Sequence, residues 1–186
     1  LLKILRHEVP ESGKVAERLG MDSISEGAAV VFKTLHAAHT GKLSMARVLG
    51  GDIAEGTTLN DERPSGVFKL LGHKQEKIAK GVPGDVVAFA RMDSVVTGNV
   101  LSASGKVECE NWPEPLTPLY AIAVNAEQRA DEVKLTGVLA KIVEEDQSLT
   151  YGPNPDTKEL IIAGLGDQHL QIVRDRLKNR FGLATV

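Results

Sequence analysis

The sequence contains few cysteine and aromatic residues. Cys109 is the only cysteine among 186 residues, so no disulfide can form within the chain, and a reducing compartment such as the cytoplasm is expected. Nothing near Cys109 in the sequence suggests an activating base, which favours an idle thiol over a nucleophile. Aromatic residues make up 4% of the chain. A hydrophobic content of 42% with 25% charged residues is typical of a globular protein, whose core must here be mainly aliphatic.

A long apolar run and a strong positive charge are also absent. No segment approaches the ~20 apolar residues that a membrane span needs, and no signal peptide is visible, so no membrane partner is expected. The net charge is −3, which excludes an overall basic field for nucleic acid and leaves only local patches for RNA contact. The chain begins Leu1-Leu2-Lys3 without Met, and we expect it to be a piece of a longer protein.

Motifs for nucleotide or metal chemistry are lacking as well. The sequence has no G-x-x-x-x-G-K-[ST] phosphate loop and no guanine-reading motif, so this chain is expected neither to bind nor to hydrolyse GTP by itself. No nucleophile–base pair is evident, although residues distant in sequence could still converge. His36 and His39 are three residues apart but have no evident third ligand, which favours structural or solvated histidines over a metal site.

The residue pattern of the first part of the chain changes near residue 25. Residues 1–24 are predicted to be helical, as a linker or the end of a preceding domain. Residues 25–111 contain short apolar segments separated by glycine turns, which predict an antiparallel β-barrel, closed or nearly closed. The predicted strands are residues 28–34, 41–49, 56–59, 67–71, 86–90 and 97–101.

A stiff connector separates this part from the rest. Residues 112–118 carry three prolines, which disfavour a helix and predict an extended linker between two domains. Residues 119–186 then follow the order β-α-β-β-α-β, which predicts a ferredoxin-like sandwich with a four-stranded antiparallel sheet. Its predicted elements are strands at 119–124, 149–151, 160–162 and 183–186, with helices at 131–145 and from 167 onward.

Three groups of residues in the second part are candidates for function. Gly164 and Gly166 form a tight turn before a helix that starts near Asp167, where a carboxylate complements the helix dipole. Glu145 and Asp146 end the preceding helix; successive helical residues point in different directions, so a solvated helix end is favoured over a catalytic pair. Two i, i+4 cationic rows occupy the last helix, and a solvated face is favoured over phosphate contact. These rows are Arg174 with Lys178 and Arg176 with Arg180.

Several of these segments resemble elongation factor G. Residues 164–170, Gly-Leu-Gly-Asp-Gln-His-Leu, resemble the G-M-G-E-L-H-L turn in the third domain of that factor, with Gln168 as a departure. Residues 144–149 resemble its E-E-D-P-S-L run, with Gln147 in place of proline. The ordered strands between residues 31 and 101 resemble the second domain of translational GTPases, and Pro113-Glu114-Pro115 resembles the junction that follows.

The resemblance implies a function for the parent protein. It would be a GTPase that binds the ribosome, contacts ribosomal RNA and proteins, and moves tRNA and mRNA, acting as a monomer in the cytoplasm. GTP and magnesium would bind an upstream GTPase domain of the same chain. The resemblance also implies a contact surface for the ribosome or that domain, formed by Glu145, Asp146, Gly164, Gly166, Asp167, His169, Arg174 and Arg176.

Other functions stay open at this point. A paralog of unknown task and a tetracycline-type ribosomal protection protein share the same domain layout. A stand-alone RNA-binding module belongs to another class, but it would usually show exposed aromatic residues and a basic field. A small-molecule enzyme is disfavoured because no catalytic constellation is evident.

Overall fold

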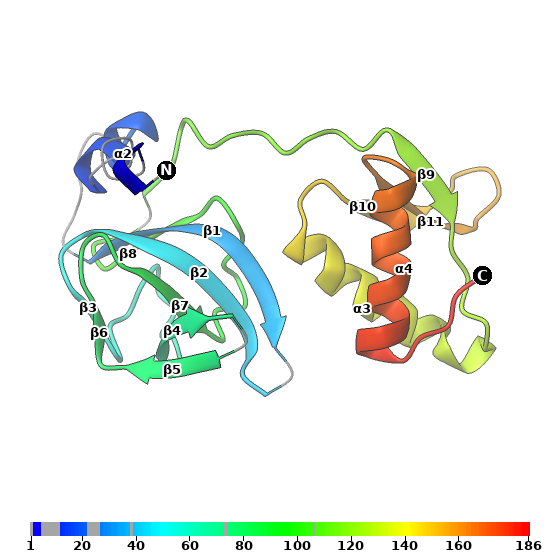
Figure 1. Ribbon diagram of the computed structural model, residues 1–186, viewed down its shortest axis with the longest axis horizontal. Helices are drawn as coiled ribbons and strands as arrows, with labels where there is room; N and C mark the ends of the chain where they lie inside the picture. Colours follow the sequence, from blue (N-terminus) through cyan, green and yellow to red (C-terminus); the bar gives the residue numbers. More distant parts are fainter. Residues whose placement is uncertain (1, 5–11, 22–26, 38, 73, 106) are drawn as a thin grey trace. The chain divides into compact units, whose positions relative to one another are not determined.

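The chain folds into two compact units, unit 1 (Leu1–Pro113) and unit 2 (Glu114–Val186). The computed structural model describes residues 2–4, 12–21, 27–37, 39–72, 74–105 and 107–186 (Figure 1). Unit 1 consists mainly of antiparallel strands, whereas unit 2 combines two long helices with a small sheet. No helix within the described ranges is long and apolar enough to cross a membrane.

Unit 1 is built on a six-stranded sheet with the strand order β5-β4-β7-β2-β1-β8. All of its ladders are antiparallel, as the sequence predicts. Among the described residues no ladder joins β5 to β8, so the sheet does not close into a barrel; of the expected closed or nearly closed antiparallel barrel, the antiparallel strands are confirmed and the closure is not. The strands are β1 (Ala28–Ala37), β2 (Gly41–Gly50), β4 (Val67–Leu71), β5 (Lys74–Ile78), β7 (Val86–Ala90) and β8 (Val100–Ser102).

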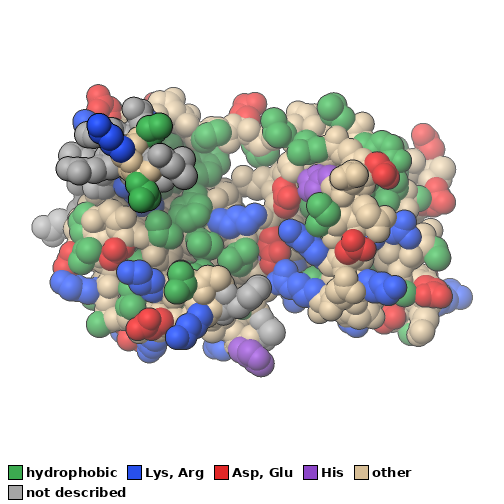
Figure 2. All heavy atoms as spheres, viewed as in Figure 1, with side chains coloured by type: hydrophobic (Ala, Val, Ile, Leu, Met, Phe, Trp, Pro, Cys, Tyr) green, Lys and Arg blue, Asp and Glu red, His purple; other side chains and the backbone are tan. Residues whose placement is uncertain are grey.

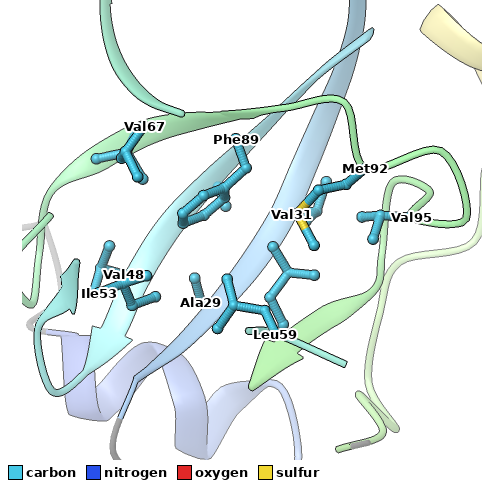
Figure 3. Packing of buried hydrophobic residues seen from close by; sticks show 12 residues of the cluster. Ala29, Val31, Val48, Ile53, Leu59, Val67, Phe89, Met92 and Val95 are labelled. Carbon is cyan, nitrogen blue, oxygen red and sulfur yellow. The ribbon is translucent and has the colours of Figure 1, made fainter. Parts of the chain in front are cut away.

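The main core of unit 1 lies on one face of this sheet (Figure 3). Phe89 of β7 is fully buried and packs with Val67, Met92 and Val31 from neighbouring segments. The cluster is otherwise aliphatic, as the low aromatic content predicts. The β1–β2 register shifts between Val31 and Lys33, which marks a bulge in the longest strand pair.

A short helix, α2 (Ser12–Arg18), packs against the other face of the sheet. Its Ala16 is 1% exposed and joins Val30, Leu49 and Val100 in a second apolar cluster. Residues 12–18 of the predicted helical segment are therefore helical and belong to unit 1. Residues 1, 5–11 and 22–24 of that segment lie outside the described residues.

Two details of unit 1 differ from the expected strands. Leu59 is fully buried but forms only an isolated bridge with Glu62, so residues 56–59 are not a strand. Gly56 has a φ of +88° there, which suits a turn. Strand β5 was not predicted because its residues are almost all polar. A separate two-stranded sheet joins β3 (Ile53–Ala54) to β6 (Lys80–Gly81).

Unit 2 packs two helices on one face of a three-stranded antiparallel sheet with the order β10-β11-β9. Ile122, Ile162 and Tyr151 are register neighbours on the core face, where they meet apolar residues of both helices. The elements are β9 (Tyr120–Ala123), η1 (Arg129–Asp131), α3 (Glu132–Glu145), β10 (Thr150–Pro153), β11 (Leu160–Gly164) and α4 (Asp167–Phe181).

The predicted fourth strand of unit 2 is not formed as a ladder. Thr185 makes an isolated bridge to Ala126, and Val186 exchanges two backbone hydrogen bonds with Asn125. The sheet therefore has three strands where the ferredoxin-like expectation had four. Within residues 183–186 only Leu183 is buried.

Candidate functional site

The turn between β11 and α4 requires glycine at its first position but not at its third. A Cβ on Gly164 would lie 2.9 Å from Leu170 Cδ2 and 3.0 Å from both His169 Nδ1 and Leu149 Cδ2. A Cβ on Gly166 would meet no atom within 4 Å, and its φ of 172° is ordinary extended backbone. Gly164 thus allows the strand to approach the helix closely. Asp167, exposed at the first position of α4, complements the positive end of the helix dipole.

His169 joins this turn to the end of α3. Its Nδ1 accepts a hydrogen bond from the Leu165 amide at 3.2 Å, and its Nε2 lies 3.2 Å from Asp146 Oδ2. A neutral imidazole with its proton on Nε2 satisfies both contacts, since Nδ1 must then be the acceptor. The side chain is 19% exposed. His169 is therefore engaged inside unit 2, between two chain segments.

Asp146 receives more hydrogen bonds than a solvated helix end would. Its Oδ1 accepts the Ser148 amide at 3.0 Å and the Ser148 hydroxyl at 2.6 Å. Partial burial disfavours the charged form, but the hydrogen bonds from Ser148 and His169 outweigh it. The pKa of the Asp146 carboxyl is consequently lowered from its usual value. Asp146 is thus a fixed anion that holds His169 in one orientation.

Glu145 forms a separate tie to the far end of α4. Its two carboxylate oxygens accept hydrogen bonds from Arg180 Nη1 and Nη2, both at 3.0 Å, in a bidentate pair. The Glu145 side chain is 6% exposed, and Arg180 also lies over the Phe181 ring at 5.0 Å. Glu145 and Asp146 do diverge, as expected for neighbours at a helix end, but each of them binds α4.

The other two predicted contact residues point outward. Arg174 and Arg176 are exposed on α4. Arg174 lines a groove of about 450 Å³ together with Lys178, Asp175 and Glu127. The guanidinium of Arg174 reaches the Thr185 carbonyl at only 3.5 Å, a long hydrogen bond. These two arginines are available to an external partner, whereas Glu145, Asp146 and His169 are held by partners inside unit 2.

The exposed face of α4 offers less positive charge to a partner than its sequence suggests. Arg180, the fourth cation of the two rows, is committed to Glu145. Acidic groups Asp175 and Glu127 border the groove beside Arg174 and Lys178. Over the visible face of unit 2, cationic and acidic side chains are interspersed (Figure 2). The face therefore provides isolated cations rather than a continuous basic patch.

The remaining candidates are the Cys109 thiol and the two histidines His36 and His39. The Cys109 thiol is half-buried; burial raises its pKa, more than a backbone hydrogen bond from Asn111 lowers it. Such a thiol is mostly protonated and a poor nucleophile, consistent with an idle thiol. Within the described part of the chain no three His, Cys, Asp or Glu side chains are grouped to hold a metal, His36 and His39 included.

The sequence does not predict the ion pair between Glu145 and Arg180. The two residues are 35 positions apart, and both lie in charged stretches that resemble solvated helix faces. One signal was present, because Glu145 follows Ile142 and Leu139 and so lies next to the apolar stripe of α3. An acid at the border of a buried stripe needs a partner, and Arg180 provides it.

Comparisons with known proteins give a consistent picture. The family model for elongation factor G, domain III, matches residues 115–186. An elongation factor G-like protein of Synechocystis is 37% identical over 188 residues, covering 100% of this chain and 28% of the relative. Elongation factor G 2 of Streptomyces coelicolor is 29% identical over 168 residues, which cover 87% of this chain and 24% of that protein.

A solved structure extends the likeness to three dimensions. A crystal structure of a protein from Thermus thermophilus superposes with a TM-score of 0.82 at 25% identity. The match covers 100% of this chain and 28% of the Thermus thermophilus chain. The chain thus spans about a quarter of the length of the curated relatives that it matches.

Proposed function

The chain belongs to the elongation factor G family, and from this premise we propose that it forms the second and third domains of a ribosome-binding translational GTPase. Unit 1 corresponds to the second domain and unit 2 to the third. The observation that carries the proposal is the likeness to an elongation factor G-like protein along the whole chain, together with the domain III match over 115–186.

Within that protein the two units transmit the nucleotide state of a GTPase domain to the ribosome. The internal ties of Glu145, Asp146 and His169 suit a mechanical role. These ties hold both ends of α4 against the end of α3. GTP and magnesium bind the GTPase domain, and the parent acts as a monomer that moves tRNA and mRNA.

The contact surface on unit 2 is narrower than the resemblance alone implies. Arg174 and Arg176 contact the phosphates of ribosomal RNA or acidic groups of ribosomal proteins, because both are exposed on α4. The turn from Gly164 to Asp167 faces the GTPase domain. Glu145, Asp146 and His169 position α4 and make no contact with the ribosome themselves.

Ribosome-stimulated GTP turnover of the full-length parent tests this proposal. We expect strong stimulation by ribosomes. We also expect that Arg174→Ala and Arg176→Ala each weaken ribosome binding and reduce its logarithmic salt dependence by about one unit. Lys141→Ala is the matched control, since Lys141 is an exposed cation on α3 and should leave binding unchanged.

The outcome also separates the alternatives. GTP turnover that ribosomes do not affect would overturn the GTPase proposal and favour an RNA-binding module. If turnover is stimulated, a translocation assay then distinguishes a translocase from a ribosomal protection protein or a paralog with another task. Unchanged binding in both arginine variants would remove α4 from the contact surface.

A further inference from the structure

The segment that enters unit 1 and the segment that leaves it lie against each other. Helix α2 precedes the first strand of the sheet, and residues 107–112 come directly before the proline-rich linker. Ala16 and Met21, at 1% and 6% exposure, pack in one apolar cluster with Val107, Cys109 and Trp112. Two parts of the chain about ninety residues apart therefore share a core.

Hydrogen bonds connect these two segments directly. The Leu19 carbonyl accepts the Asn111 amide at 3.2 Å and the Cys109 thiol at 3.5 Å. The Arg18 carbonyl accepts the Asn111 side-chain amide at 3.3 Å. Carbonyls at the end of a helix have no partner within the helix, so these donors also cap α2.

The approach of the two segments depends on glycine at two positions. Gly20 has a φ of +71°, and a Cβ there would lie 3.0 Å from Asn111 Nδ2 and 3.2 Å from Glu110 Cβ. On the other side, a Cβ on Gly98 would meet the Trp112 ring at 3.1 Å. Trp112 thus packs closely on the turn before β8, while Asn111 beside it is bonded to α2.

Trp112 is the last anchored residue before unit 1 ends. It is half-buried, whereas the five residues that follow it, 113–117, are all exposed. None of these five makes a hydrogen bond that fixes it to unit 1 among the interactions described. The linker therefore becomes free at Pro113, at a point set by the contacts of Asn111 and Trp112.

We propose that residues 18–20 and 109–112 form a clasp that couples the position of α2 directly to the start of the linker. The clasp makes the two chain connections of unit 1 move as one body. A displacement of α2 is then passed to the linker by direct contact, in addition to the packing that α2 and Trp112 share with the sheet. This inference concerns contacts within unit 1 and does not depend on the proposed function.

Hydrogen exchange in the 186-residue chain tests the clasp. Asn111→Ala removes one hydrogen bond and weakens a second, while the side chain it replaces is exposed, so the fold is kept. We expect amide exchange to accelerate about threefold to tenfold in both segments, at 19–21 and at 109–112. Asn154→Ala is the matched control, because it removes an asparagine that holds a local turn in unit 2.

A distance measurement tests the coupling itself. Spin labels are placed through Glu17→Cys and Glu108→Cys, both at exposed positions of unit 1, in a Cys109→Ser background, which keeps a donor toward Leu19. We expect a narrow distance distribution that broadens when Asn111→Ala is added. Faster exchange at only one of the two segments, or an equally wide distribution with and without Asn111→Ala, would overturn the proposal.

Discussion

Unit 1 and unit 2 keep their elements in place by different kinds of contact. In unit 1 the strands are fixed by their ladders and by an apolar cluster around Phe89 that contains no charged residue. Two ion pairs among its described residues, Lys77 with Glu55 and Lys80 with Asp52, are about half exposed and contribute little to stability. In unit 2 an aliphatic core is present too, but two charged ties join the ends of its helices.

The kind of contact determines which interactions of each unit can be broken separately. Apolar burial has no direction, and its strength follows the area removed from water. Charged hydrogen bonds need defined geometry and respond to pH. Consequently the charged ties between α3 and α4 can be broken without removing any side chain from the aliphatic core of unit 2, whereas the strands of unit 1 cannot shift without losing their register.

The largest effect is expected from truncating the core of unit 1. Phe89→Ala should lower the free energy of unfolding of unit 1 by about 3–5 kcal/mol, because it removes a fully buried aromatic ring and leaves a cavity. Denaturant unfolding followed by fluorescence of Trp112, the single tryptophan, reports on unit 1. Leu71→Ala, at an 81% exposed position, is the control with little expected change. A loss below about 1 kcal/mol for Phe89→Ala would contradict the apolar account of unit 1.

A smaller effect is expected at the strand–helix turn of unit 2. Gly164→Ala should destabilise unit 2 by about 1–3 kcal/mol, because the new methyl group meets Leu170, His169 and Leu149 at 3.0 Å or less. Gly166→Ala is its matched control, with open space around the same group. Circular dichroism at increasing denaturant measures both variants. Equal stability of the two variants would show that the turn does not need the close approach.

Breaking one charged tie should cost somewhat less. Arg180→Leu should destabilise unit 2 by about 1–2 kcal/mol, because Glu145 stays largely buried without its partner. Arg176→Leu removes an exposed cation on the same helix and should have little effect. Adding Glu145→Gln to Arg180→Leu should recover part of the loss, which a double-mutant cycle measures. Purely additive losses would mean that the pair does not act as a tie.

The smallest effect is expected from pH. The pKa of Asp146 is lowered in the folded state, so its contribution is present above the ordinary carboxyl range and is lost as pH falls through the lowered value. Unit 2 should therefore lose stability in the acid range, below about pH 4, through this group. Asp146→Asn should flatten that part of the pH profile, measured by thermal unfolding of both proteins. An unchanged acid profile would contradict the role of Asp146.

Much of the fold could be predicted from apolar periodicity. Strands β1, β2, β4 and β7 and both long helices of unit 2 place apolar residues at strand or helix spacing, and the structure has them near the predicted bounds. Strand β5 is not predicted by apolar periodicity because Lys74–Ile78 is a polar edge strand, which its ladder with β4 holds in place. The open edges of unit 1 could not be foreseen, since no local pattern reports whether the first and last strands of a sheet pair.

The candidate site was predicted less completely. The need for glycine at residue 164 could be anticipated from the tight strand-to-helix turn, and the structure supplies its reason. The partners of Glu145, Asp146 and His169 could not, because hydrogen bonds between segments 23 and 35 residues apart leave no trace in spacing; the apolar stripe beside Glu145 indicates only that Glu145 needs a partner. A sequence does not distinguish an exposed cation, such as Arg176, from a cation that is bound to a carboxylate, such as Arg180.

The position of β8 has a consequence for synthesis of the chain. The β1–β2 pair is complete once Gly50 is made, but the outer edge of β1 at Ala28–Val30 is covered only when Ser102 follows, 102 − 50 = 52 residues later. At about 5–20 residues per second this delay lasts roughly 3–10 seconds. During that time a long apolar strand with an unpaired edge can join another chain. The nascent protein therefore passes through a brief stage in which aggregation competes with folding, and the pairing of Val100–Ser102 with Ala28–Val30 then shortens the exposed edge.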